Sequence, residues 1–189
     1  PLALSSLAHQ SFDTYDLVVC DYEQLPMLAS KAPQLQKYLF EGGVVCVHAP
    51  LVETQLEQLQ IVRTELLSAR AELSKNNRLE TSVLQEIEAT EAEIKQYVQQ
   101  RCGRVFRFAS ELNYSLSGSG RVAAGHPLLT EPFLFYRLPQ IQQQLAHVFC
   151  WGGVVLMVSN LVDTWALSDR IAPSRNTLRT AQEWGINLL

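Results

Sequence analysis

The residues best suited to covalent chemistry in this chain are Cys46 and His48, which stand two positions apart. Both belong to residues 44–49, a largely apolar run that is typical of a buried strand. Side chains two positions apart on a strand share one face of the sheet, so the histidine could activate the thiol as a nucleophile. Within two positions of Cys46 there is no Lys, Arg or Gly to lower the pKa of its thiol or to expose its sulfur. We therefore expect an inert core cysteine and a strand-end histidine that bonds to the backbone.

His126 is a further candidate, and it stands between Gly125 and Pro127, where we expect a turn rather than a ligand. The four histidines of the chain do not fall at the helical i, i+4 spacing of a metal site. They are His9, His48, His126 and His147. Residues 117–120, Ser-Gly-Ser-Gly, lack the lysine of a phosphate-binding loop and are typical of a flexible linker. The sequence predicts no metal and no cofactor.

A polar segment follows the predicted strand at residues 154–159, and open α/β sheets place ligand sites just beyond their strands. This segment contains Asp163, Trp165 and the adjacent pair Asp169 and Arg170. The Asp–Arg pair is typical of a solvated surface. Trp165 is the residue that we expect to cover something, because an apolar ring in a loop usually does.

The elements that must position these residues are of two physical kinds. Residues 53–101 hold nine Glu and six Lys or Arg, whereas all nine glycines and all eight prolines lie outside residues 51–102. The whole chain carries 15 basic and 19 acidic residues, so it has no basic excess with which to bind nucleic acid. We expect a helical insertion at residues 51–102 within an α/β domain formed by residues 1–50 and 103–189.

Within the insertion, apolar residues recur at the 3-4 spacing of a coiled-coil seam. The seam residues are Leu59, Val62, Leu66, Ala69 and Leu73, then Val83, Ile87, Thr90, Ile94 and Tyr97. The polar residues 74–78 separate the two sets, and Asn77 with Glu80 resembles a helix-capping box. This pattern predicts an antiparallel hairpin with arms at residues 53–74 and 79–100. One continuous helix is the alternative, because the spacing runs on without a break.

Other apolar residues of the insertion lie off this seam: Leu56, Ile61, Leu67, Leu79, Leu84 and Val98. Exposed on a free hairpin, they would form a patch that soluble monomers avoid. We expect a second copy of the chain, or another protein, to cover Ile61, Leu67, Leu79, Leu84 and Val98. The alternative is that residues near the base of the hairpin pack back on the parent sheet.

The flanking segments predict the α/β domain. Residues 16–22 and 44–49 are expected strands, joined by a helix at residues 34–40 that Pro33 opens and Gly42–Gly43 ends, which makes a parallel crossover unit. Residues 104–108 alternate like a strand. Residues 148–151 and 154–159 are expected to form a hairpin around Gly152–Gly153. Ser174 is expected to cap a last helix whose buried face carries Leu178, Ala181, Gly185 and Leu188.

Membrane insertion and cellular location are also addressed by the sequence. Residues 145–162 carry no formal charge and approach the length of a membrane span, although the double glycine favours a β-hairpin there. The chain begins at Pro1 rather than Met, and we expect that both ends have been trimmed. A cytoplasmic location is favoured over a periplasmic or membrane-anchored one.

The order of these segments resembles the class I glutamine amidotransferase-like superfamily. Residues 16–22, the helix up to Gly43, residues 44–49 and residues 125–129 carry the resemblance. It is nearest to the trehalose-utilisation (ThuA-like) proteins and to a related bacterial family of unknown function, whose closing strand and helix match residues 154–159 and 181–188. The resemblance implies a flavodoxin-like three-layer sandwich whose opening strand and helix would precede Pro1, interrupted by the inserted coiled-coil hairpin.

The chemistry of that superfamily does not transfer to this chain. Its amidotransferases place a nucleophilic cysteine on a sharp G-x-C-x-G turn, and no cysteine here has glycine two positions away on both sides. We expect a non-catalytic protein whose amidotransferase-like domain presents the hairpin for self-association or partner binding. The alternative is a ThuA-like hydrolase or ligand-binding domain, with its site at the sheet edge near His48, His126 or residues 163–169.

Overall fold

The computed structural model describes residues 12–51, 55–75, 81–136, 138, 140–141, 144–160 and 175–189. The chain divides into two compact units. The first contains Pro1–Pro50 and Cys102–Leu189, and the second contains Leu51–Arg101. We call them the sheet unit and the helix-pair unit, and each is described by itself.

The sheet unit is built on an open mixed sheet of four strands in the order β1-β2-β6-β5. The strands are β1 (Leu17–Asp21), β2 (Val44–Ala49), β5 (His147–Trp151) and β6 (Val154–Val158). Strands β1, β2 and β6 run parallel, and β5 pairs antiparallel with β6. A separate two-stranded sheet joins β3 (Gln140–Ile141) to β4 (Gln144–Leu145). The protein is therefore of the mixed α/β class.

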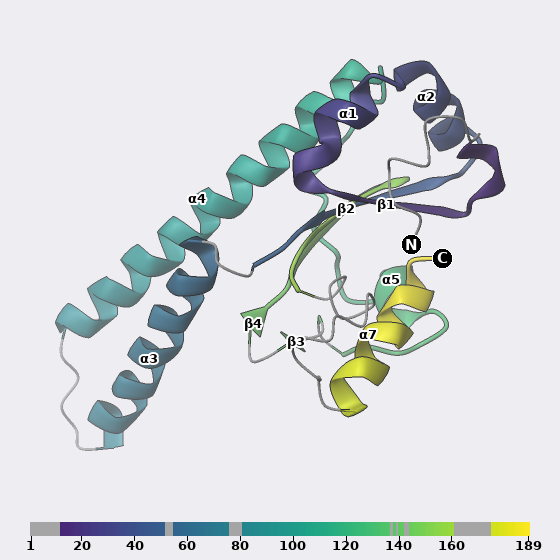
Figure 1. Cartoon of the computed structure of the whole chain (residues 1–189). Helices are drawn as coiled ribbons and strands as arrows, with labels where there is room; N and C mark the ends of the chain where they lie inside the picture. The colour runs from purple at the N-terminus through teal and green to yellow at the C-terminus, as the bar shows by residue number, and fades with distance from the viewer. Residues whose placement is uncertain are drawn as a thin grey trace. The chain divides into compact units, whose positions relative to one another are not determined.

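Helices cover both faces of this sheet, as parallel strands require. Figure 1 shows α1 (Leu25–Ala29) and α2 (Ala32–Phe40) on one side, with α5 (Pro127–Thr130) and α7 (Arg175–Asn187) on the other. Two 3-10 turns, η2 (Phe12–Thr14) and η3 (Tyr22–Gln24), flank β1. The predicted strand–helix–strand crossover is confirmed, because β1 and β2 pair in parallel and α2 lies between them in the sequence.

The predicted hairpin around Gly152–Gly153 is also confirmed. Gly152 has a φ of 61°, which L-residues with a side chain rarely adopt, and the two strands pair from His147↔Val158 to Trp151↔Val154. The uncharged run that approaches the length of a membrane span therefore contains two short antiparallel strands. Among the residues that the structure describes, no helix has the length and apolar character needed to cross a membrane.

The prediction of a strand at residues 104–108 is wrong, because these residues lie in α4 (Thr81–Glu111). Their alternation is too short to separate a strand from one side of a helix. Val105, Phe108, Ala109 and Leu112 are buried at helical spacing, whereas Phe106 is partly exposed against Trp151. The helix ends at Glu111, and Asn113, two residues later, has a φ of 51°, the left-handed conformation that commonly terminates a helix.

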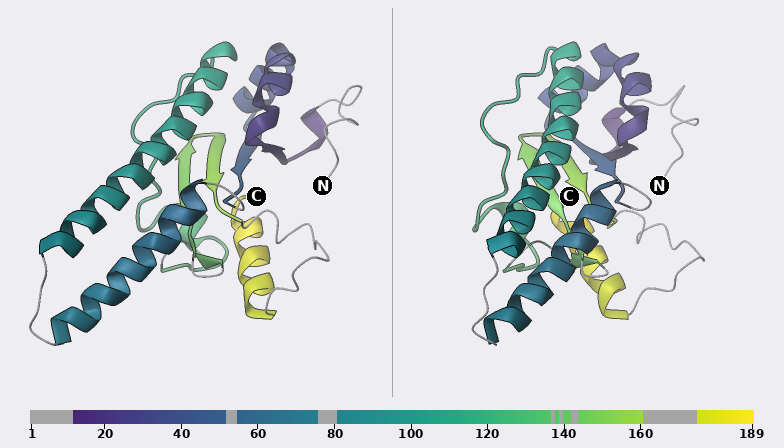
Figure 2. Two further views of the ribbon diagram at one scale, coloured as in Figure 1. Left: turned by 60° about the vertical axis from the view of Figure 1, so that its left-hand side comes forward. Right: turned by 90° about the vertical axis from the view of Figure 1, so that its left-hand side faces the viewer.

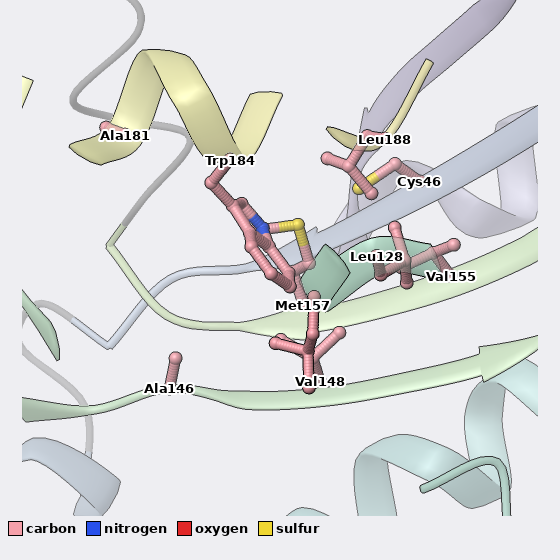
Figure 3. Packing of buried hydrophobic residues seen from close by; sticks show 10 residues of the cluster. Cys46, Leu128, Ala146, Val148, Val155, Met157, Ala181, Trp184 and Leu188 are labelled. Carbon is pink, nitrogen blue, oxygen red and sulfur yellow. The ribbon is translucent and has the colours of Figure 1, made fainter. Parts of the chain in front are cut away.

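The core beneath α7 is centred on Trp184. Figure 3 shows this ring between the helix and the sheet, with Met157 next to it and with Cys46 and Val155 farther along the sheet, near Leu188 and Leu128. Phe135 meets the same ring edge-on, with 5.4 Å between the centroids. Ala181 and Leu188 are buried as predicted, but the buried face of α7 is centred on Trp184 and not on Gly185, which is only half-buried.

In the helix-pair unit, α3 (Gln55–Lys75) lies beside residues 81–101 of α4, and the chain reverses between them (Figure 2). The Arg63 guanidinium contacts the Glu91 carboxylate at 2.8 Å. One straight helix would separate these two residues by roughly 42 Å at 1.5 Å per residue. A pair of helices, and not one continuous helix, is therefore present.

The seam of this pair matches the prediction on one helix and differs on the other. On α4, Ile87, Thr90 and Ile94 are buried, as their spacing predicts. On α3, the fully buried residues are Leu56 and Gln60, whereas the predicted seam residue Val62 is 43% exposed. The prediction considered apolar residues only and therefore omitted Gln60. As a result, it placed the buried face of α3 at a different angle around the helix axis.

A buried asparagine ties α7 to the segment that follows α5. The Nδ2 group of Asn187 donates to the carbonyl oxygens of Leu128, at 3.1 Å, and Phe133, at 2.8 Å. Its Oδ1 atom accepts from the Phe133 amide at 3.0 Å. The Asn187 side chain thus makes three hydrogen bonds to the backbone of Leu128 and Phe133, which do not belong to a β-strand.

We predict that Asn187→Ala lowers the free energy of unfolding by about 2–4 kcal/mol, because it removes three hydrogen bonds and leaves buried backbone groups unpaired. Urea denaturation followed by circular dichroism measures this change. Gln182→Ala, at an exposed position of the same helix, is the matched control and should change stability by less than about 0.5 kcal/mol. Equal effects of the two substitutions would contradict the assignment.

Candidate functional site

Polar side chains gather at the carboxyl ends of the parallel strands. The strand register places Asp21, the last residue of β1, beside His48 of β2. The Nε2 atom of His48 donates to the carbonyl oxygen of Ser159, just after β6, at 2.9 Å. Its Nδ1 atom lies 3.4 Å from Oδ1 of Asp21. His48 thereby connects three parallel strands at the edge where open α/β sheets bind ligands.

The surroundings of His48 define what this group can do. The ring is 1% exposed, and Ser159 and Asn160 are buried with it, whereas the Asp21 side chain is 60% exposed. A carbonyl oxygen can only accept, so the proton on Nε2 is committed to Ser159. Nδ1 then donates to Asp21 only when the ring is an imidazolium. The ring is held by its neighbours, and Asp21 is the member of the group that reaches solvent.

The Cys46 thiol is fully buried in the core cluster that contains Trp184, and it lies beside Leu188 (Figure 3). Burial raises its pKa to about 12, which keeps the thiol protonated at neutral pH. Burial also raises the pKa of the neighbouring Cys20, with further contributions from Cys46 and Asp21. Cys46 and His48 thus lie on the same strand, but the Cys46 thiol is not activated as a nucleophile.

His126 occupies the N-cap position of α5. Its Nδ1 atom accepts a hydrogen bond from the Leu128 amide at 3.2 Å, so that the side chain closes the turn before the helix. The turn predicted around His126 is confirmed. Residues 163–170, with the candidates Asp163, Trp165 and Asp169, lie outside the described residues.

The end of β1 is fixed to the last turns of α4. The Arg104 guanidinium lies 3.1 Å from the Glu23 carboxylate and 4.5 Å from the centroid of the Tyr22 ring. The Asp21 amide donates to Oε1 of Gln24 at 3.1 Å. These contacts hold η3 in place, and η3 directly follows the carboxylate that faces His48.

The sequence reasoning selected His48 but missed Asp21, Ser159 and Asn160. Asp21 and Ser159 each follow an apolar run, and three such runs were expected to be strands. Parallel strands end at a common edge of the sheet. A prediction that β2 pairs with β6 would therefore have placed Asp21, His48 and Ser159 close together. That pairing joins segments more than one hundred residues apart.

A shallow groove of about 650 Å³ lies beside α5 and the end of α7. Its lining is mainly apolar and includes Pro127, Leu128, Pro132, Ile186 and Leu189. Asn187 also lines it, but the polar atoms of that side chain are already bonded to the backbone. Within the described part of the chain, no group of three or more His, Cys, Asp or Glu side chains could hold a metal ion.

The expected interaction residues of the hairpin lie in different environments. Ile61 is 50% exposed, and Leu67 and Leu84 are half-buried. Val98 is only 5% exposed, which corrects the expectation that it is left uncovered on a free hairpin. Leu79 lies outside the described residues. Val62 was assigned to the seam, yet it joins Ile61 on the exposed surface of α3.

The fold and this site together define a mixed α/β protein with an open four-stranded sheet and a long helix pair. Comparisons with protein-family models, with curated proteins and with solved structures give no match. The function must therefore be argued from the arrangement of the residues themselves.

The burial of the cysteines predicts the order in which they react. Iodoacetamide at pH 8 should modify the half-buried Cys102 and Cys150 in the native protein, while Cys20 and Cys46 stay unmodified. With a pKa of about 12, only about one Cys46 thiol in ten thousand is ionised at that pH. Peptide mass spectrometry before and after denaturation in urea measures the difference. Rapid native alkylation of Cys46 would show that the site is open.

The His48 contacts predict a structural penalty. His48→Ala should lower the free energy of unfolding by about 2–4 kcal/mol, because it creates a cavity and leaves the Ser159 carbonyl without this donor. His48→Gln should cost less, since its amide can still donate to that carbonyl. Urea denaturation of both variants provides the comparison. If the two variants lose the same stability, the Nε2 hydrogen bond is not what holds the strand ends together.

Proposed function

We propose that this chain is a non-catalytic interaction protein in which the sheet unit presents the helix pair for association with a second copy of itself. One observation carries the proposal: Ile61 and Val62, neighbours on α3, are 50% and 43% exposed although the helix pair has its own buried seam. Covering the exposed halves of two such side chains contributes about 1 kcal/mol each.

The size of the helix pair supports an interface between copies. Its described arm α3 has 21 residues and is therefore about 32 Å long. Two helices side by side, each about 10 Å across, offer roughly 600 Å² per partner. The total of about 1,200 Å² is at the lower limit for a specific complex, so a weak or readily reversible dimer fits this surface.

The chemistry of the sheet edge supports the non-catalytic part of the proposal. The candidate nucleophile Cys46 is buried with a raised pKa, and the Nε2 proton of His48 is committed to a backbone carbonyl. These side chains stabilise the strands instead of presenting a reactive atom.

For the sheet unit, we propose an amidotransferase-like domain of flavodoxin-like topology. The parallel strands β1, β2 and β6, with helices over both faces, support this assignment. The antiparallel β5 at one edge is compatible with it, since many doubly wound sheets carry such an edge strand.

A second candidate function is the binding of a small ligand at the sheet edge, in the manner of the ThuA-like proteins. The exposed carboxylate of Asp21 beside buried His48, Ser159 and Asn160 favours it, because this edge is the usual ligand position in such sheets. Titration with divalent metals and with small esters and amides, read as thermal stabilisation, distinguishes this candidate from a purely structural edge.

The self-association proposal is tested by the double variant Ile61→Glu with Val62→Glu. Charges at both positions should shift the protein to monomer in sedimentation velocity, while the circular dichroism of the folded chain is unchanged. Ala71→Glu with Ser74→Glu, at exposed positions on a different side of the same helix from Ile61 and Val62, is the matched control and should leave association intact. A wild-type chain that sediments as a monomer at every concentration would refute the proposal.

A further inference from the structure

A glycine stands inside the longest helix of the protein. Gly103 is in α4, two residues after Arg101, where the helix-pair unit ends and the sheet unit resumes. Glycine inside a helix destabilises it by up to about 1 kcal/mol relative to alanine, because it has more conformational freedom to lose. Such a residue in a 31-residue helix needs a reason.

Packing does not give that reason. Gly103 is exposed, and a Cβ atom added to it would meet nothing within 4 Å. Its φ is not in the left-handed region, so the backbone at this position would accept any L-residue. Neither a close approach within this chain nor a strained turn requires glycine here.

The helix is anchored independently on each side of Gly103. After it, Val105 and Phe108 are buried in the sheet unit and Arg104 pairs with Glu23. Before it, Ile94 and Val98 are buried. The glycine thus occupies the short stretch between two sets of anchors.

We propose that Gly103 is a hinge, at which α4 bends so that the helix pair changes its orientation relative to the sheet unit. Helix propensity is lowest at this point, so bending there disturbs neither set of anchors. The chain crosses between the units once more, at residues 50–51, which belong to no helix or strand. The hinge does not depend on the proposed self-association.

The test measures the spread of distances between the two units. Spin labels are attached to cysteines introduced at exposed positions, Gln34→Cys on α2 and Glu72→Cys on α3, in the full chain with Cys102→Ala and Cys150→Ser. Double electron–electron resonance then gives the distance distribution for Gly103 and for Gly103→Ala. Gln99→Ala, one turn earlier and also exposed, is the matched control, because it raises helix propensity without removing the glycine.

We expect Gly103→Ala to narrow the distribution, whereas Gln99→Ala leaves the width unchanged. We also expect Gly103→Ala to lower the equilibrium constant for unfolding by about 2- to 5-fold, which confirms that the variant folds. An identical width for Gly103 and Gly103→Ala overturns the hinge. The hinge is also overturned if Gly103→Ala leaves the width of the distance distribution unchanged but abolishes association in sedimentation. That result would mean that another chain approaches Gly103 closely.

Discussion

The pairing of β2 on both of its edges is the constraint on which the sheet unit depends. Strand β2 lies between β1 and β6, and five of its six residues are buried. A parallel strand in this position must be covered on both faces, so helices are needed above and below it. The same burial makes Cys46 a core residue and leaves His48 with backbone and carboxylate partners. The most reactive residue types of the chain thus stabilise its centre.

The helix-pair unit obeys a weaker constraint. Its two helices bury one seam, and most of their other residues are in contact with solvent. The Arg63–Glu91 ion pair crosses between the helices, but a partly exposed ion pair contributes only about 0–1 kcal/mol. The stability of this unit therefore rests on few apolar contacts. Ile61 and Val62 remain exposed on this unit, and they are the apolar residues that the proposed self-association would cover.

Local patterns in the sequence were sufficient for the four strands of the main sheet and for the hairpin turn. Residues 16–22 and 44–49 are apolar runs bounded by turn residues, and Gly152 has the positive φ that only glycine adopts readily. The error at residues 104–108 arose because five alternating residues fit a strand and a helix equally well. On α3, the buried residues include Gln60, which a prediction based on apolar residues alone omits. The partners of His48 were missed because they lie 27 and 111 residues away in the sequence, and no local pattern contains that information.

The pairing of β2 with β6 also has a consequence for how the chain folds. Val45 pairs with Val154, so this contact closes a loop that contains both long helices. Loop-closure entropy rises slowly with length, at about 0.6 kcal/mol for each doubling. A helix pair forms from local contacts and turns the chain back on itself, so its early formation shortens the loop that remains to be closed. Early formation of the helix pair therefore offsets the loop-closure entropy that the inserted residues would otherwise add.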